Sequence, residues 1–256
     1  MTLLELSAFI IYLYFNLSLL KHKIIFMKKI VFALLLLTCC LNVFSQTKLD
    51  NIVNRVLDTL GGKAKLMTIR TIKKTGNGEQ QGIKFPVNYY AVHNISERSD
   101  FSFNGLTGYQ IITKDSGFNF SPFNGMAGAE RMTAQDIKLA SDELDQEGSL
   151  VNYTEKGHTI DLMENEDIDG VDAIQLRMNL KNGKTIFYFI DPDSYYIIRT
   201  VTKGVSNGQE FSNTANYYNF KRTKEGILFP YTVDTITFDN IELNVPIDDK
   251  LFSTKK

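Results

Sequence analysis

Residues 182–220 read NGKTIFYFIDPDSYYIIRTVTKGVSNGQEFSNTANYYNF. Three runs rich in aromatic and β-branched side chains, 185–190, 196–203 and 211–220, are separated by Asp191-Pro192-Asp193-Ser194 and by Asn207-Gly208. Asn-Gly and Asp-Pro segments form tight turns, because Asn and Gly tolerate positive φ and Pro presets the turn geometry. The stretch therefore predicts consecutive antiparallel strands.

Similar runs and turns continue on both sides of this stretch. The runs occupy residues 68–75, 83–93, 97–104, 109–114, 117–121, 159–163, 173–180, 227–231, 233–238 and 240–245. Turns at intervals of about 8–12 residues are typical of an antiparallel sheet, sandwich or barrel. No internal repeat or low-complexity linker interrupts the pattern, so residues 46–256 are predicted to form a single, mainly β domain with a few helices.

Two segments have helical periodicity instead. In residues 49–60 apolar side chains recur every three or four positions, and Gly61-Gly62 follows as a stop signal. Residues 133–144 begin with Thr133 as a candidate N-cap and carry Ile137, Ala140 and Leu144 on one side. Both helices are amphipathic, so we expect them to cover the sheet.

The N-terminal segment has the features of a secretory signal peptide. Met27 is followed by two lysines, an apolar run over residues 30–37 and a small residue, Ser45. We interpret residues 27–45 as the signal peptide and residues 1–26 as an extension from an upstream start codon. A membrane helix over residues 3–20 is the alternative. The predicted location is the periplasm.

Both cysteines, Cys39 and Cys40, fall inside this signal. A lipid-anchored form would use one of them, but the preceding residue is then Thr38 or Cys39, which fits a lipoprotein signal poorly. Cleavage after Ser45 leaves a chain with no disulfide and no thiol nucleophile.

Charge argues against nucleic acid as a partner. The full chain has 28 Lys and Arg against 29 Asp and Glu, and the segment before residue 46 removes four lysines and one glutamate, which leaves a net charge of −4. No basic stripe is present to neutralise phosphates.

Motifs for catalysis are equally weak. His93 and His158 have no ligand at metal-binding spacing, and no Gly-x-Ser-x-Gly sequence occurs. We predict that the protein is not an enzyme and needs no cofactor or metal. A secreted hydrolase with two carboxylates brought together by folding is a less favoured alternative.

An acidic segment partly resembles a calcium loop. Asn165, Asp167, Asp169 and Gly170 match the first, third, fifth and sixth loop positions, but the twelfth is Leu176 instead of Glu. Asp169-Gly170 is better interpreted as a hairpin turn with solvated carboxylates.

Several motifs occur together in a characteristic order. They are Gly61-Gly62 with Leu66, Ile69 and Thr71; Gly157-His158-Thr159-Ile160-Asp161-Leu162; Tyr188 to Ser194; Tyr218-Asn219-Phe220 followed by Gly226 to Pro230; and Asn244 to Asp248 before Leu251-Phe252. This order resembles the LolA/LolB-like superfamily of outer-membrane lipoprotein-sorting proteins, in its Bacteroidetes-type version. The resemblance implies an incomplete β-barrel, a curved antiparallel sheet covered by amphipathic helices. It also implies an arginine that ties the helical lid to the sheet, for which Arg70 and Arg98 are candidates.

The resemblance further implies lipid or lipoprotein acyl chains held in an apolar cavity between sheet and helices, in sorting to the outer membrane. The residues that we predict to line this cavity are Leu176, Met178, Phe187, Phe189, Ile198, Tyr218, Phe220, Ile241 and Leu243. In residues 187–190 both strand faces are apolar, so the inward set stays open there. Each of these residues could instead be packed core.

The expected partners follow from this hypothesis. They are acyl chains or lipoproteins and an envelope protein, with transient membrane contact and a monomeric state. The alternative from another class is an envelope protein-interaction module with the same fold and no ligand.

Overall fold

The three runs in residues 182–220 are strands β10 (Thr185–Ile190), β11 (Ile197–Ser206) and β12 (Gln209–Arg222) in the computed structural model, which describes residues 48–254. Tyr188 pairs with Thr200, which pairs with Ala215, so the three strands are antiparallel neighbours. Asn207 and Gly208 have φ of 51° and 78°, as a type I′ hairpin turn requires. The predicted hairpin is confirmed.

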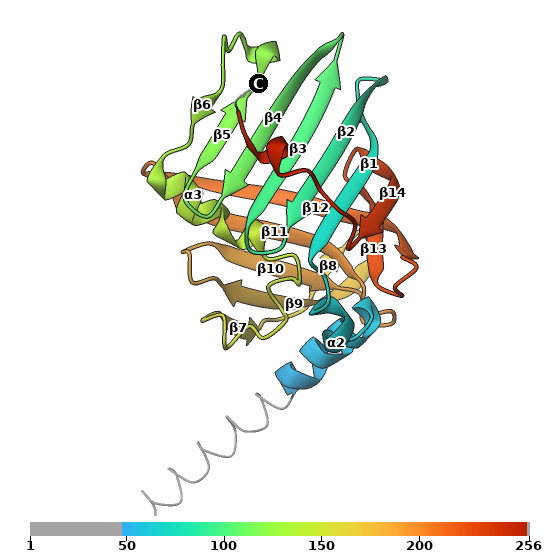
Figure 1. Cartoon of the computed structure of the whole chain (residues 1–256). Coiled ribbons are helices and arrows are strands. Elements are labelled where there is room, and N and C mark those ends of the chain that lie inside the picture. Colours follow the sequence, from blue (N-terminus) through green and yellow to red (C-terminus); the bar gives the residue numbers. More distant parts are fainter. Residues whose placement is uncertain (1–47, 255–256) are drawn as a thin grey trace, which may run out of the picture. The chain divides into compact units, whose positions relative to one another are not determined.

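These strands belong to one antiparallel sheet of 14 strands that is not closed (Figure 1). The order is β6-β5-β4-β3-β2-β1-β14-β13-β12-β11-β10-β9-β7, with β8 paired to β9 beside this path. The remaining strands are β1 (Thr71–Gln80), β2 (Ile83–Val92), β3 (Ser96–Phe103), β4 (Leu106–Thr113), β5 (Gly117–Phe120), β6 (Glu130–Arg131), β7 (Thr159–Leu162), β8 (Glu166–Ile168), β9 (Val171–Asn179), β13 (Leu228–Val233) and β14 (Ile236–Leu243). The predicted mainly β class with an antiparallel, incompletely closed sheet is confirmed.

The chain divides into two units. The first, residues 1–51, is described only over residues 48–51, which are helical. The second, Ile52–Lys256, contains the whole sheet. The signal peptide predicted over residues 27–45 and the extension before it lie outside the described residues. The domain boundary predicted at residue 46 stays a prediction.

Helices in the second unit are short. Residues 52–60 are helical, followed by α2 (Lys63–Leu66), η1 (Pro122–Asn124), α3 (Ala134–Ala140), η2 (Ser141–Leu144) and η3 (Asp249–Phe252). The Thr133 hydroxyl accepts a hydrogen bond from the Asp136 N–H, so the predicted N-cap of α3 is confirmed. Within residues 48–254, no helix has the length and apolar character needed to cross a bilayer.

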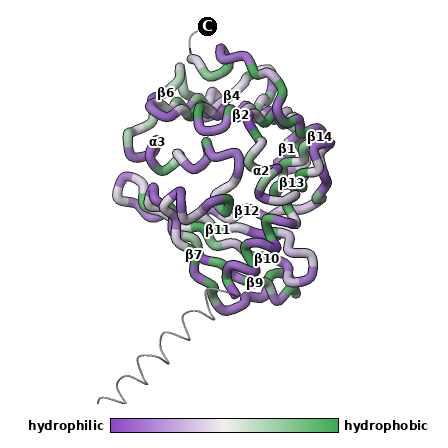
Figure 2. Tube along the Cα trace, turned by 60° about the horizontal axis from the view of Figure 1, so that its bottom comes forward, coloured by the Kyte–Doolittle hydropathy of each residue, from purple (hydrophilic) through white to green (hydrophobic). Residues whose placement is uncertain are grey.

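The sheet curves around one face, and α3 lies beside the gap between its two ends (Figure 2). Ile112 on β4 packs with Ala140 and Leu144, which places α3 and η2 on this face. We call it the inner face. The opposite, outer face of β3 meets η3 near the C-terminus, where the Arg98 guanidinium donates to the Leu251 carbonyl at 2.8 Å.

The main difference from the predicted elements lies near the C-terminus. The runs 233–238 and 240–245 are largely one strand, β14, and the turn falls before it at Asp234, which has φ of 49°. Asp239, which separates the two predicted runs, is accommodated by a β-bulge where β1 pairs with β14, between Thr75 and Gly76. The calcium-like segment is the β8–β9 hairpin, with Asp169 and Gly170 at its turn as predicted.

Candidate functional site

The nine residues predicted to line a cavity divide between the two faces of the sheet. Leu176 and Met178 are fully buried and share the inner face with Tyr188. Phe187, Phe189 and Ile198 belong to an apolar cluster on the outer face with Ile168 and Ala173. Because paired residues project from the same face, these two groups cannot line one cavity.

The other four predicted residues also do not lie together. Ile241 and Leu243 are buried opposite Lys74 and Ile72, on the inner face. Tyr218 is 51 % exposed, and Phe220 packs on the Tyr196 ring with centroids 4.5 Å apart. Members of the predicted set therefore lie on both faces of the sheet, and their role in lining a cavity stays a prediction.

The centre of the inner face is polar. Lys74 lies in the middle of β1, between Ile241 on β14 and Tyr89 on β2. Its ammonium is 4.8 Å from the ring centroid of Tyr89, 5.4 Å from that of Phe238 and 5.6 Å from that of Phe229. Among residues 48–254 it makes no hydrogen bond or ion pair, so its described contacts are cation–π contacts. Burial lowers the pKa of Lys74, and the nearby Glu97 carboxyl opposes this.

Glu97 lies beside this ammonium and is itself only 7 % exposed. Burial, reinforced by Glu143, raises the pKa of Glu97 to about 8, so the carboxyl is mainly protonated at neutral pH. The Tyr89 hydroxyl lies 3.1 Å from Glu97 Oε2 and 3.0 Å from Gln146 Oε1. A protonated Glu97 can donate to the Tyr89 hydroxyl, which then donates to Gln146. At neutral pH Glu97 therefore offers Lys74 no anionic partner.

Helices α3 and η2, which cover the inner face, are tied to the chain just before β10. Lys184, before β10, pairs with Asp142 at 2.7 Å and with Glu143 at 3.6 Å. The Asn182 amide donates to Asp142 and to the Leu139 carbonyl, both at 2.8 Å. Arg70 pairs instead with Glu147 at 3.7 Å, after the cover, and Arg98 binds η3. The tether that we expected from Arg70 or Arg98 is made here by Lys184 and Asn182.

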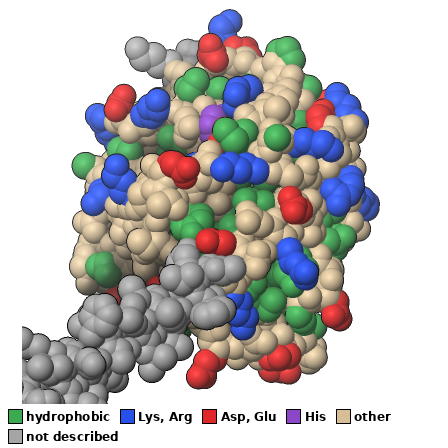
Figure 3. Space-filling view, turned by 90° about the horizontal axis from the view of Figure 1, so that it is seen from below, with side chains coloured by type: hydrophobic (Ala, Val, Ile, Leu, Met, Phe, Trp, Pro, Cys, Tyr) green, Lys and Arg blue, Asp and Glu red, His purple; other side chains and the backbone are tan. Residues whose placement is uncertain are grey.

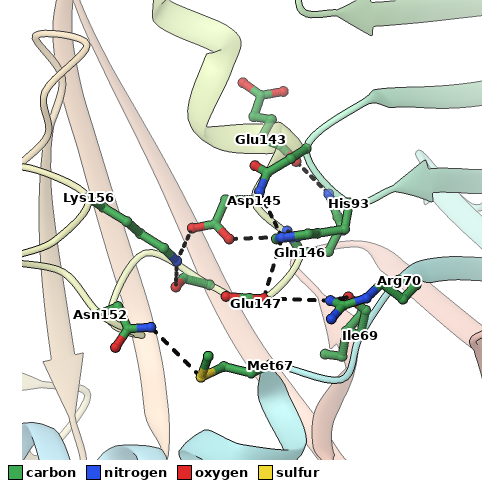
Figure 4. Close-up of polar contacts among 12 residues, drawn as sticks. Met67, Ile69, Arg70, His93, Glu143, Asp145, Gln146, Glu147, Asn152 and Lys156 are labelled. Carbon is green, nitrogen blue, oxygen red and sulfur yellow. Dashed lines mark hydrogen bonds and ion pairs between the residues drawn. The ribbon is translucent and has the colours of Figure 1, made fainter.

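A second polar cluster follows η2 (Figure 4). His93, Asp145 and Glu147 offer atoms that lie within 4.8 Å of one another, a spacing that a metal ion could bridge. However, Lys156 already pairs with Asp145 at 2.5 Å and Arg70 with Glu147. The His93 ring also accepts the Gln146 N–H at 3.1 Å through Nδ1. The charges are thus balanced without a metal, and the cluster holds the loop after η2 to the sheet.

His158, the second histidine considered in the sequence, lines an open pocket of about 410 Å³ together with Asp145 and Lys156. Its Nδ1 accepts the Lys181 N–H at 3.2 Å. A larger pocket, about 830 Å³, lies between α3 and the ends of β10–β12, and its wall is mixed, with Lys138 and Lys203 beside Leu139, Val205 and Phe211. Acidic and basic side chains are interspersed on the face seen in Figure 3.

An aromatic pocket lies at the end of the sheet where the β1–β2 and β3–β4 turns meet η1. Its volume is about 590 Å³, and apolar side chains dominate its wall: Ile83, Phe85, Phe101, Phe103 and Phe123. The Phe123 ring lies 5.6 Å from Phe101 and 6.3 Å from Phe103. Phe103 and Phe123 are each 37 % exposed and Ile83 is 51 % exposed, so the pocket opens to solvent.

Glycines shape the floor of this aromatic pocket. A Cβ on Gly78 would overlap the Phe85 ring, and a Cβ on Gly108 would overlap the Phe101 ring. Both rings therefore lie over bare backbone. Phe85, Phe101 and Tyr89 share the inner face, so the aromatic pocket and Lys74 lie on the same side of the sheet.

The sequence does contain an indication that a lysine of β1 lies on the inner face. Lys73 and Lys74 are adjacent in a strand, so one of the two ammonium groups must point inward. No comparable signal exists for the His93 cluster, whose partners lie more than 50 residues away in the sequence.

Comparison with known proteins yields structures only. No family model and no curated protein matches the sequence. The chain is structurally similar to a LolA superfamily protein from Nitrosomonas europaea, with 13 % identity, 77 % of this chain and 97 % of that chain covered, and a TM-score of 0.46. It is also similar to a DUF1329 family protein from Desulfovibrio piger, with 11 % identity, 80 % and 96 % covered, and a TM-score of 0.43. A third match is the Pseudomonas aeruginosa MucA/MucB complex, with 11 % identity, 78 % and 60 % covered, and a TM-score of 0.27. All three similarities are at low sequence identity and with TM-scores below 0.5.

Proposed function

We propose that this protein is a non-catalytic binding protein of the cell envelope that holds an acyl chain against the inner face of its sheet. The observation that supports this most directly is the aromatic pocket of about 590 Å³ at the open end of that face. Its volume falls within the range of about 300–1,000 Å³ found for small-molecule sites. Its wall of phenylalanines suits a hydrocarbon chain.

The expected affinity follows from the length of chain that the pocket covers. Burying about eight methylenes at ~0.8 kcal/mol each gives about 6 kcal/mol before association costs. The protein should therefore bind a lipid weakly and reversibly, as a carrier in lipoprotein sorting requires. Membrane contact in this proposal is transient, and the working location is the periplasm.

The first experiment is a lipid extraction. The purified protein is extracted with organic solvent and the extract is analysed by mass spectrometry, while the protein is titrated with a neutral environment-sensitive dye. We expect an acyl lipid in the extract, and dye fluorescence that the added lipid quenches by displacement.

Variants locate the site. Phe103→Ser and Phe123→Ser should each weaken binding about tenfold, because each removes one apolar wall worth about 1–2 kcal/mol. Leu106→Ser is the matched control, since Leu106 is 50 % exposed at the same turn but does not line the aromatic pocket. Equal loss in all three variants would argue against this pocket.

A protein partner is the competing result. Exposed apolar side chains at this end of the sheet also suit protein docking. An empty extract and no dye binding, together with co-purification of an envelope protein that Phe103→Ser abolishes, would replace the lipid proposal by a docking module.

A further inference from the structure

The unpartnered ammonium of Lys74 indicates what kind of acyl ligand the inner face accepts. Lys74 is enclosed by three aromatic rings on β2, β13 and β14, and among residues 48–254 no carboxylate pairs with it. Lys74 is half-buried, so its ammonium stays within reach of a ligand and has no anionic partner among the described residues.

The surroundings exclude the usual explanation, a buried ion pair. Each charged or titratable group that faces this part of the inner face has another role. Glu97 on β3 is mainly protonated at neutral pH, and Tyr89 on β2 is neutral. Asp142 and Glu143 on η2 are paired with Lys184. Lys221 on β12 shares this face, but its ammonium lies 4.9 Å from the Tyr231 ring. Lys74 therefore has no anionic partner at the centre of the inner face within residues 48–254.

Lys74 and the aromatic pocket are connected by an apolar tract. Tyr89, which contacts the ammonium, and Phe85, which lines the aromatic pocket, lie four residues apart on the same face of β2. At about 3.4 Å per residue this separation is about 14 Å. Gly76 and Val87, which pair with each other, lie between them and present no polar side chain.

We propose that the ligand is a long-chain carboxylic acid, bound with its carboxylate at the Lys74 ammonium and its hydrocarbon chain along β2 toward the aromatic pocket. This inference rests on the proposed function and specifies the substrate class. A single ammonium matches the single negative charge of a carboxylate. A phosphate monoester carries nearly two negative charges at pH 7, of which one ammonium balances only one.

The test compares two ligands that differ only in their head group. Dodecanoate and dodecan-1-ol displace the neutral dye from the protein at pH 7, and the ratio of their affinities is measured. We expect the acid to bind at least tenfold more tightly to the unchanged protein. Lys74→Met should reduce this ratio to within about twofold, because the alcohol retains its chain contacts.

The matched control is Lys73→Met. Lys73 is the neighbouring residue on the opposite face, is 38 % exposed and pairs with Glu242 at 3.3 Å. This variant removes the same charge from the same strand but from the other face, so it should leave the preference for the acid intact. Lys74→Gln, which keeps a polar side chain without charge, provides a second variant should methionine alter the fold.

A spectroscopic measurement on the unchanged protein is independent of any variant. The carboxyl carbon of ¹³C-labelled dodecanoate should titrate at lower pH when bound than when free, because an adjacent ammonium stabilises the carboxylate. Equal binding of acid and alcohol, an acid preference that survives in both Lys74 variants, or a carboxyl titration unchanged on binding would each overturn the inference while leaving acyl binding in place. Failure of both ligands and of the dye to bind would overturn the proposed function as well.

Discussion

Replacing Glu97 by glutamine should change how the stability of the protein depends on pH. The side chain is 7 % exposed, and burial raises its pKa from the ordinary 4.5 to about 8. The folded protein therefore binds a proton that the unfolded chain releases between these two values. Stability contributed by this proton is present at low pH and is lost as the pH rises through 8.

The size of the effect follows from the two pKa values. Linkage gives a contribution of about 4 kcal/mol at pH 5 and about 0.5 kcal/mol at pH 8, which is a loss of about 3.5 kcal/mol. Glutamine has nearly the same shape, can still donate to the Tyr89 hydroxyl through its amide, and cannot ionise. The free energy of unfolding of Glu97→Gln should thus rise by about 3.5 kcal/mol relative to the unchanged protein between pH 5 and pH 8.

Urea denaturation at the two pH values measures this directly. With a slope of about 2–3 kcal/mol per M, the difference between the midpoints of the two proteins should change by roughly 1–2 M urea. Glu242→Gln removes a half-buried carboxyl that pairs with Lys73 on the outer face, and should give a change below about 1 kcal/mol. If the stability curves of the unchanged protein and Glu97→Gln run parallel, the carboxyl is not held protonated in the folded state and the electrostatic account of the inner face is wrong.

Three further outcomes are expected. Gly76→Ala should lower stability by about 2–4 kcal/mol, because a Cβ there would overlap a backbone carbonyl of β14, while Gly128→Ala, which meets nothing, should be near neutral in thermal melts. Lys184→Met should cost about 2–4 kcal/mol by leaving the carboxylates of η2 unpaired, and limited proteolysis should then cut within residues 134–144; resistance equal to that of the unchanged protein would argue against the tether. Thr133→Ala should cost about 1 kcal/mol in denaturant unfolding through loss of the α3 N-cap, whereas Thr133→Ser should restore most of it.

Local structure was largely readable from the sequence because it depends on neighbouring residues. Asn104-Gly105, Asp169-Gly170 and Asn207-Gly208 all adopt positive φ at hairpin turns, as their residue types predict. The motif residues of the resemblance also act locally: the Asp191 carboxylate accepts the N–H groups of Asp193 and Ser194 at 2.9 and 2.8 Å and holds the turn before β11. Turn chemistry and alternation therefore determined the strands, their sequential pairing and the mainly β class.

Only the tertiary structure determines which side chains come together on each face of the sheet. The sheet places β1 beside β14, which brings Lys74 next to Ile241 and Phe238 from the far end of the chain. The run 187–190 is apolar on both sides, so its orientation depends on what covers each face, and Phe187 and Phe189 face outward into the β8 hairpin cluster. Sequence alone determines which residues alternate, since that follows from strand geometry. It does not determine the charge state of Glu97, the isolation of Lys74 or the convergence on His93, because these depend on burial and on partners that only the folded chain brings together.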